Sequence, residues 1–285
     1  MIWLIGNKGM LGREIGEQFA AAGIPVIASD REVDIADMSA IEKFASAHNP
    51  EWIVNCAAYT AVDQAESEED IAAVINSDGP ANLAGYAAKT GAKLIHLSTD
   101  YVFDGAKRSP YTEDDKPNPQ SAYGRTKLDG ERRIIDALPR HFIIRTAWLY
   151  GPYGKNFAAT MLRLFSERSE VRVVDDQSGT PTYSLGLARN IVDMVHSDSD
   201  KYGIFHYTDD GETTWYEFAR EIYTIARGLG MLAKEVEILP VTTLEYPTAA
   251  KRPQYSVLSK DKIIRELGFT VADWKTNLRA YLERV

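Results

Sequence analysis

Residues 1–20 read MIWLIGNKGMLGREIGEQFA and divide into three parts. Residues 1–5 are an apolar run of strand length, residues 6–12 hold glycines at every third position, and residues 13–20 have the pattern of an amphipathic helix. Glycines at this spacing let the backbone turn tightly and approach a diphosphate, and the helix start offers N–H groups to an anion. A tight strand–helix turn that binds nothing would use the same residues, so a second signal is needed.

The chain up to residue 150 continues to alternate strands with helices. We predict strands at 24–29, 52–57, 93–98 and 141–146, and helices at 39–47, 71–89 and 123–138. Strands that are separated by helices form mostly parallel sheets, because each connection crosses over the sheet. The sequence therefore predicts an α/β fold with a Rossmann-like, doubly wound parallel sheet.

The second signal is a tyrosine–lysine pair. Tyr123 and Lys127 are four residues apart, so on a helix they share a face. A nearby ammonium favours the ionised form of a phenol, so we expect Lys127 to lower the pKa of Tyr123 and improve it as a proton donor or acceptor. Thr99 follows the strand at 93–98, at the edge where open α/β sheets carry ligands. Together with the glycine loop, these residues predict a catalytic site beside a bound nucleotide cofactor.

Charged residues near the second strand bear on the choice of cofactor. Asp30 ends that strand, where a carboxylate can accept hydrogen bonds from the adenosine ribose. Arg31 beside it, with Lys8 in the glycine loop, could instead neutralise a 2′-phosphate. Asp30 favours NADH, whereas Arg31 and Lys8 favour NADPH. We therefore expect both cofactors to be accepted, with a preference for NADPH.

Composition restricts the class of protein. The 285 residues are 45% apolar and 26% charged, and no apolar run approaches the roughly 20 residues that cross a bilayer. A formal net charge of −9 without a basic tract argues against nucleic acid as a partner. The N-terminus lacks the features of a signal peptide, so we expect a cytoplasmic protein without a membrane partner.

No metal site is predicted. Cys56 is the only cysteine, so neither a disulfide nor a thiolate metal site is expected. The five histidines show no metal-ligand spacing, and His96, which lies within a predicted strand, is expected to be a packed core residue.

Several blocks of sequence together resemble one family. The chain resembles the dTDP-4-dehydrorhamnose reductases, within the extended short-chain dehydrogenase/reductase superfamily. The resemblance covers nearly the whole chain and rests on residues 6–12 (GNKGMLG), 54–66 (VNCAAYTAVDQAE), 98–105 (STDYVFDG), 123–128 (YGRTKL), 145–151 (RTAWLYG), 179–182 (GTPT) and 252–258 (RPQYSVL).

The resemblance implies a reaction and a set of contacts. Hydride would pass from the nicotinamide to C4 of a dTDP-linked 4-keto sugar, giving dTDP-L-rhamnose, with Thr99, Tyr123 and Lys127 as the catalytic residues. The implied cofactor contacts are Gly6, Gly9, Met10, Leu11, Gly12, Asp30, Arg31, Asp34, Ile35, Ala57, Ala58, Tyr59, Tyr123 and Lys127. The implied substrate contacts are Thr99, Asp100, Tyr101, Trp148, Asn156 and Arg252.

The rest of the chain would complete the substrate site. Beyond Gly151 the alternation loosens, with helices predicted at 157–167, 187–196, 214–227 and 259–267 and ordered loops at 175–181 and 246–253. We expect an NAD(P)-binding Rossmann domain at 1–150. Residues 151–285 would form mainly a smaller C-terminal α/β substrate lobe, with some segments returning to the Rossmann domain.

Some members of the resembled family dimerise through a magnesium ion held by carboxylates. Glu14 fits the first ligand position, but Leu185 occupies the second, so a monomer is expected here.

Two alternatives stay open at this point. The regulatory subunit of methionine adenosyltransferase shares the fold and several motifs, yet acts as a binding partner. A reductase of another nucleotide 4-keto sugar would also use these residues. An epimerase or dehydratase fits less well, because no glutamate follows Asp100.

Overall fold

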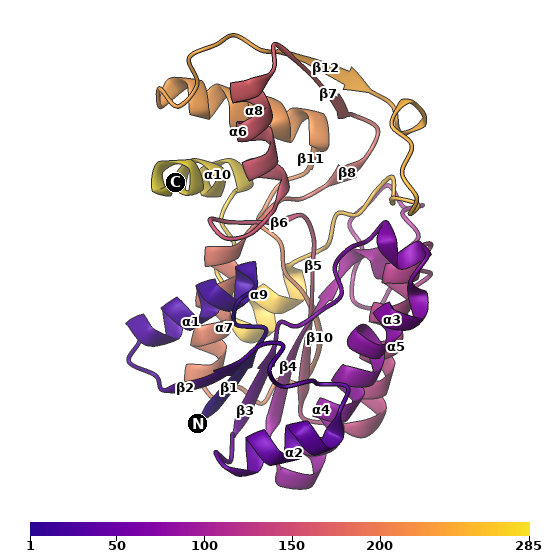
Figure 1. The fold of residues 1–285 in the computed structure, drawn as a ribbon, viewed down its shortest axis with the longest axis vertical. Coiled ribbons are helices and arrows are strands. Elements are labelled where there is room, and N and C mark those ends of the chain that lie inside the picture. Colours follow the sequence, from indigo (N-terminus) through magenta and orange to yellow (C-terminus); the bar gives the residue numbers. More distant parts are fainter.

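A computed structural model describes all residues from Met1 to Val285. The lower part of the molecule in Figure 1 is built on a six-stranded parallel sheet. The strands lie in the order β10-β5-β4-β3-β1-β2, and every neighbouring pair is parallel. Their bounds are β1 Ile2–Ile5, β2 Val26–Ser29, β3 Trp52–Asn55, β4 Lys93–Thr99, β5 His141–Thr146 and β10 Gly203–His206. The predicted doubly wound parallel fold is confirmed.

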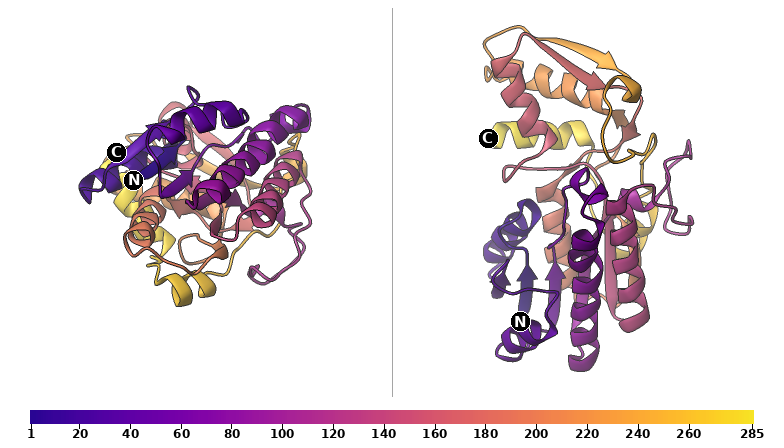
Figure 2. Two further views of the ribbon diagram at one scale, coloured as in Figure 1. Left: turned by 90° about the horizontal axis from the view of Figure 1, so that it is seen from below. Right: turned by 45° about the vertical axis from the view of Figure 1, so that its right-hand side comes forward.

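Helices cover both faces of this sheet, as the views in Figures 1 and 2 agree. One face carries α1 (Met10–Ala21), α7 (Ser184–His196) and α9 (Asp261–Leu267), and the other carries α2 (Met38–Ser46), α4 (Gly79–Thr90) and α5 (Ala122–Ala137). Ile2 and Leu4 belong to the core on the first face, whereas Trp3 and Ile5 belong to the core on the second. A strand buried on both sides needs an uninterrupted apolar run, which is why the chain begins with one.

The helix predicted at 71–89 is a composite. It consists of α3 (Glu69–Ala73), a π-helical turn (Val74–Asp78) and α4, joined without a break. Asn76 in the π-helical turn donates to the Thr126 hydroxyl of α5, which fixes the turn against that helix.

The order of the strands places a switch point in the sheet between β1 and β3. The chain runs from β1 to β2 on one side and then crosses to β3 on the other. Loops at such a point diverge and leave a crevice at the carboxyl ends of the strands. The glycine loop after β1 lies at this crevice.

The upper part has its own core. It contains α6 (Phe157–Glu167), α8 (Trp215–Gly228) and α10 (Trp274–Arg284), with the parallel pair β7 (Glu170–Val174) and β12 (Glu237–Val241) (Figure 1). Two short pairs lie between the parts, β6 (Leu149–Tyr150) with β9 (Thr182–Tyr183) and β8 (Ser178–Gly179) with β11 (Thr213–Thr214). After β5 the chain enters the upper part, and it returns to the sheet with α7 and β10. It then enters the upper part again with α8 and β12, returns to the sheet with α9, and ends in the upper part with α10.

The helices predicted beyond residue 150 are present, but α10 was not predicted. Its buried residues Trp274, Leu278, Tyr281 and Leu282 recur at helical spacing within a charged segment. Asp273 caps the helix by accepting from Lys275 N and Thr276 N, so a capping signal was available in the sequence. No helix in the structure is both long and apolar enough to cross a membrane.

Candidate active site

The glycine loop is shaped by close backbone contacts. Gly6 follows β1 with φ of +76°, a conformation that L side chains rarely adopt. A Cβ at Gly12 would overlap the Gly6 carbonyl oxygen, so the helix can start this near the strand only with glycine there. Gly9 is the N-cap of α1, and no side chain caps the first turn. Free N–H groups at a helix start fit an anion such as a diphosphate.

Thr99, Tyr123 and Lys127, hereafter the trio, meet at the carboxyl end of β4. Thr99 is the last residue of β4, and Tyr123 and Lys127 lie one turn apart on α5. The Ser121 side chain caps α5 by accepting from Gly124 N at 3.2 Å. A Cβ at Gly124 would overlap the Tyr101 carbonyl oxygen, so this glycine lets α5 approach the loop after β4.

The trio and the glycine loop share one cavity of about 510 Å³. The predicted residues that line it are Gly9, Met10, Leu11, Gly12, Ala58, Thr99, Asp100, Tyr101, Tyr123, Lys127 and Trp148. Residues that were not predicted but also line it include Cys56, Thr60, Val62, Thr146 and Lys155. The structure thus brings an anion-binding loop and a hydroxyl–phenol–amine cluster into a single space.

The protonation of the trio differs from the expectation. Burial raises the pKa of Tyr123 to about 12. A hydrogen bond with Thr99 acts to lower this pKa, and the nearby Asp100 carboxylate acts to raise it. Burial lowers the pKa of Lys127 to about 8. The pKa of Tyr123 is thus raised, and the prediction that Lys127 lowers it is wrong. The physical reason is that Lys127 Nζ points to Leu97 O, at 2.7 Å, and to His96 Nε2, at 3.1 Å.

Asp100 is a buried carboxylate without a full set of partners. Its Oδ1 accepts from the Thr99 hydroxyl at 3.0 Å, whereas Oδ2 has no hydrogen-bond partner. Burial raises the pKa of Asp100 to about 6, although hydrogen bonds from Ser256, Thr99 and the backbone act in the opposite direction. An unpaired buried oxygen on the cavity wall is suited to accept a hydroxyl of a ligand.

Trp148 lines the cavity, but one of its faces is already covered. Its indole stacks on Trp215 of α8, with ring centroids 3.5 Å apart and planes 11° apart. Gly179 also lies against the indole, since a Cβ there would be 2.5 Å from Trp148 Cε2. A sugar that meets Trp148 can use only the area that these two neighbours leave free.

Asn156 does not line the cavity. It is the N-cap of α6, accepting from Ala159 N at 2.9 Å and donating to Gly151 O at 2.8 Å. Its amide therefore contacts the backbone on both sides, and the substrate contact expected of this side chain stays a prediction. The neighbouring Lys155 lines the cavity instead and makes no ion pair. Sequence reasoning missed Lys155, although an asparagine before an apolar helix was a capping signal.

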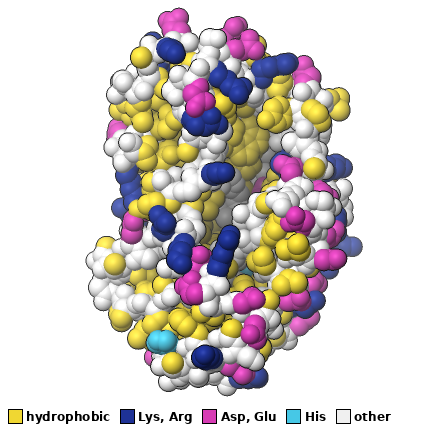
Figure 3. All heavy atoms as spheres, viewed as in Figure 1, with side chains coloured by type: hydrophobic (Ala, Val, Ile, Leu, Met, Phe, Trp, Pro, Cys, Tyr) yellow, Lys and Arg dark blue, Asp and Glu magenta, His cyan; other side chains and the backbone are white.

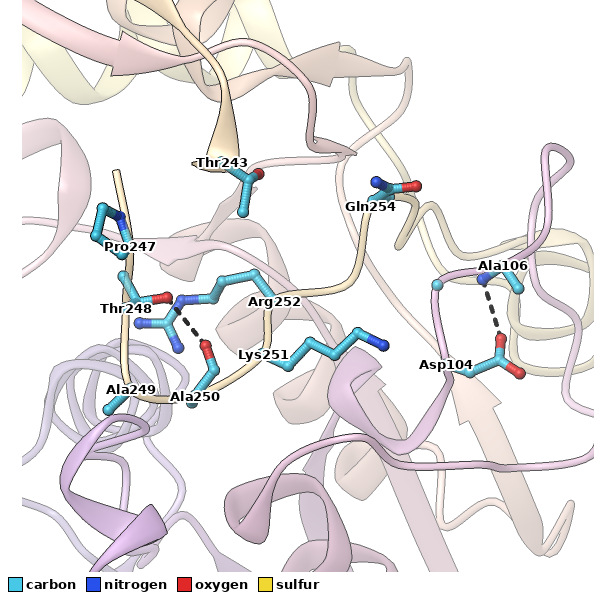
Figure 4. A pocket seen from close by; sticks show the side chains of 11 residues that line it. Asp104, Ala106, Thr243, Pro247, Thr248, Ala249, Ala250, Lys251, Arg252 and Gln254 are labelled. Atoms are coloured by element: carbon cyan, nitrogen blue, oxygen red, sulfur yellow. Dashed lines mark hydrogen bonds between the residues drawn. The ribbon is translucent and has the colours of Figure 1, made fainter. Parts of the chain in front are cut away.

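Arg252 lines a second hollow of about 530 Å³ together with Lys251 and Thr248 (Figure 4). One nitrogen, Nη2, is 2.7 Å from Asp63 Oδ2, and the other, Nη1, is buried without a partner. The Arg252 charge opposes the rise that burial causes in the pKa of Tyr101, which lines the first cavity. Lys and Arg side chains lie along the hollow between the two parts of the molecule in Figure 3.

The remaining predicted cofactor residues lie outside the cavity. Asp34 accepts from Ala36 N in a local turn, and the Ile35 side chain is buried against Gly79 in the core. The other residues in this group are Gly6, Asp30, Arg31, Ala57 and Tyr59. Lys8, considered for a 2′-phosphate, is 3.2 Å from Glu32, while Arg31 is exposed without an ion pair.

Glu14, considered above as a metal ligand, is fully buried. Its Oε1 is 2.7 Å from Arg284 Nη1, and no group of three or more potential metal ligands occurs in the structure. The guanidinium thus supplies the cation that faces this carboxylate. The expectation of a monomer stays a prediction.

The family model described as the RmlD substrate binding domain matches residues 1–285. The chain belongs to the RmlD family. Within this family, a dTDP-4-keto-6-deoxy-D-glucose reductase of Streptomyces niveus is 42% identical over 280 residues, or 97% of this chain and 94% of that protein. These matches confirm the family resemblance inferred from the motifs.

Two solved RmlD-family structures have the same fold. A dTDP-4-dehydrorhamnose reductase of Clostridium acetobutylicum is 43% identical with a TM-score of 0.93, covering 99% of this chain and 98% of that one. The enzyme of Bacillus anthracis, in complex with NADP, is 37% identical with a TM-score of 0.93, covering 100% and 99%.

Proposed function

We propose that this chain uses NADPH to reduce the C4 ketone of dTDP-4-dehydro-β-L-rhamnose to dTDP-L-rhamnose. The observation that carries the proposal is the single cavity that joins the glycine loop to the trio, in a chain whose relatives are reductases of dTDP-linked keto sugars. The cofactor supplies the hydride when it is bound.

The glycine loop fits such a cofactor. Its diphosphate would lie at the uncapped start of α1, beside Gly9, Met10 and Leu11, with Gly6 and Gly12 leaving room for the backbone. Asp30 and Arg31 would face the adenosine ribose and Asp34 and Ile35 the adenine, the latter through its backbone. Ala57, Ala58 and Tyr59 would follow the cofactor towards the trio. NADH is expected to be accepted as well.

The trio would stabilise and protonate the oxyanion that forms at C4. Tyr123 would donate its phenolic proton to that oxygen, and Thr99 would donate a hydrogen bond to it. Lys127 would hold the nicotinamide ribose. Burial favours the protonated form of Tyr123, so the proton is in place before the reaction.

Other residues would bind the nucleotide sugar. Asp100, through its unpaired Oδ2, and Tyr101 would accept or donate hydrogen bonds to the sugar, and Trp148 would contact it by its free edge. Lys155 and Arg252 would meet the diphosphate with their positive charges, and Asn156 would lie beside Lys155 at the start of α6. The sheet part, 1–150, would thus hold the cofactor, and residues 151–285 mainly the substrate.

The direct test is NADPH oxidation, followed by nicotinamide absorbance, with dTDP-4-keto-6-deoxyglucose in the presence and absence of a matching 3,5-epimerase. Oxidation that depends on the epimerase supports the rhamnose reaction. Oxidation in the absence of the epimerase favours a second candidate function, reduction of dTDP-4-keto-6-deoxy-D-glucose itself. The Streptomyces niveus relative bears the name of such a reductase. No oxidation by a chain that binds NADPH would overturn both and return attention to a regulatory subunit, which the relatives do not favour.

Arg252→Ala tests the substrate site separately. We expect a weaker affinity for the nucleotide sugar and a nearly unchanged affinity for NADPH, both measured by calorimetry. Asp63→Asn is the matched control, because it removes the ion-pair partner and leaves the guanidinium in place. An equal loss of both ligands in Arg252→Ala would show that Arg252 does not belong to the substrate site.

A further inference from the structure

Lys127 ends a row of buried polar side chains, and the other two members, Asn55 and His96, have no part in the proposed reaction. The parallel register of β3 and β4 sets Asn55 beside His96, and both are fully buried. Asn55 Nδ2 is 3.1 Å from His96 Nδ1, and His96 Nε2 is 3.1 Å from Lys127 Nζ. The imidazole therefore lies between an amide and the amine of the trio.

One backbone group fixes the direction of every hydrogen bond in this row. Ala57 N lies 3.0 Å from the Asn55 side chain, and a backbone N–H can only donate, so the amide oxygen must face it. The amide NH₂ group then faces His96 Nδ1, which must accept. An imidazole that accepts at Nδ1 is neutral and carries its proton on Nε2. That Nε2–H is directed at Lys127 Nζ.

An ammonium has no lone pair and cannot accept this hydrogen bond, whereas an uncharged amine can. The amine can accept from His96 and still donate to Leu97 O, 2.7 Å away. We propose that Asn55 and His96 favour the uncharged form of the Lys127 amine and so make it easier to deprotonate than an ordinary lysine. His96 is thus a positioning residue that acts through Lys127 and touches neither substrate nor cofactor.

Glu131 and Cys56 raise the pKa of Lys127 and so oppose this state, but burial outweighs both of them. Glu131, one turn further along α5, is paired with Arg145 at 2.7 Å, and both side chains are buried. Burial raises the pKa values of Cys56 and Tyr123 to about 12, so both are neutral near pH 7. Burial also lowers the pKa of His96 well below its usual value, in agreement with a neutral ring.

The consequence for turnover rests on the proposed function. An uncharged Lys127 exerts no attraction on a Tyr123 phenolate, so only the protonated form of Lys127 makes the phenol more acidic. His96 would then set the pH at which the amine and the phenol begin to act as a pair. The protonation of Lys127 itself can be measured without any substrate.

The experiment is a pH titration of the full, cofactor-free chain by NMR, with ¹³C- and ¹⁵N-labelled lysine. The Lys127 signal is identified by its loss in Lys127→Met. His96→Gln places an amide where Nε2 stands, and the amide can turn its oxygen to an ammonium. We expect the wild-type midpoint at about 8, and a midpoint about one pH unit higher in His96→Gln, a tenfold gain in proton affinity.

Two further variants complete the test. His96→Asn removes the donor to Lys127 and should also raise the midpoint, so the inference can be tested if the glutamine variant does not fold. Ser77→Ala removes a hydrogen bond to Asp129 of the same helix, α5, and should leave the midpoint unchanged. Equal midpoints in the wild type and both His96 variants, or a wild-type Lys127 still charged at high pH, would overturn the inference. Neither result depends on whether the chain reduces a keto sugar.

Discussion

Replacing Asp100 by asparagine should stabilise the protein near neutral pH and lower its turnover. Asp100 is 2% exposed, its Oδ2 has no partner, and burial raises its pKa from 3.8 to about 6. A shift of about two units means that the folded chain disfavours the carboxylate by ~3 kcal/mol. Because the folded pKa lies above the unfolded one, this cost is small near pH 4, grows as the pH rises between the two pKa values, and is complete above about pH 7.

The assay is urea unfolding, followed by tryptophan fluorescence, at about pH 4.5 and about pH 7.5. From these two pKa values we expect the wild type to lose about 2 kcal/mol of unfolding free energy relative to Asp100→Asn between the two conditions. Asp193→Asn, at an exposed residue of α7, is the control for the substitution itself. A difference between wild type and Asp100→Asn that is the same at both pH values would refute the reasoning. Turnover of the variant should fall about ten- to a hundredfold, as expected for a lost hydrogen bond to a charged group.

Three other outcomes are expected. Tyr123→Phe should lower turnover at least about a hundredfold and leave the NADPH dissociation constant nearly unchanged; normal turnover would remove the phenol from the chemistry. Gly12→Ala should abolish NADPH binding in a fluorescence titration, because its Cβ would overlap the Gly6 carbonyl oxygen. Gly16→Ala on the same helix is the control and should bind NADPH normally, because its Cβ would lie 3.6 Å from Leu4 Cδ2, an ordinary contact distance. Arg145→Met should reduce the free energy of unfolding by about 3–5 kcal/mol by leaving Glu131 charged, buried and unpaired, and a loss below about 1 kcal/mol in urea would contradict this.

The sheet could be predicted from the sequence because its signals are local. The apolar run before Gly6, the glycines that follow and the alternation up to residue 150 each depend on neighbouring residues, and β1, α1 and β5 lie where these patterns indicate. The trio could be predicted for the same reason, since Tyr123 and Lys127 share a helix and Thr99 ends a strand.

The remaining features depend on contacts between distant parts of the chain. Trp148 stacks on Trp215, and Arg252 pairs with Asp63, and no local pattern links either pair. Asn156 could serve equally as a helix cap or as a ligand contact, and only the structure shows that its amide is used by the backbone. The pKa of Lys127 depends on burial beneath a sheet, which a four-residue spacing does not reveal.

Arg284, close to the end of α10, connects the two parts of the molecule through α1. Its guanidinium lies 2.7 Å from Glu14 and 3.1 Å from Glu17, on the helix that begins at the glycine loop. An affinity tag joined directly after α10 would therefore lie beside α1, the helix that is proposed to bind the cofactor diphosphate. For purification and for labelling with dyes, a long flexible spacer at this end would keep the added groups away from that helix.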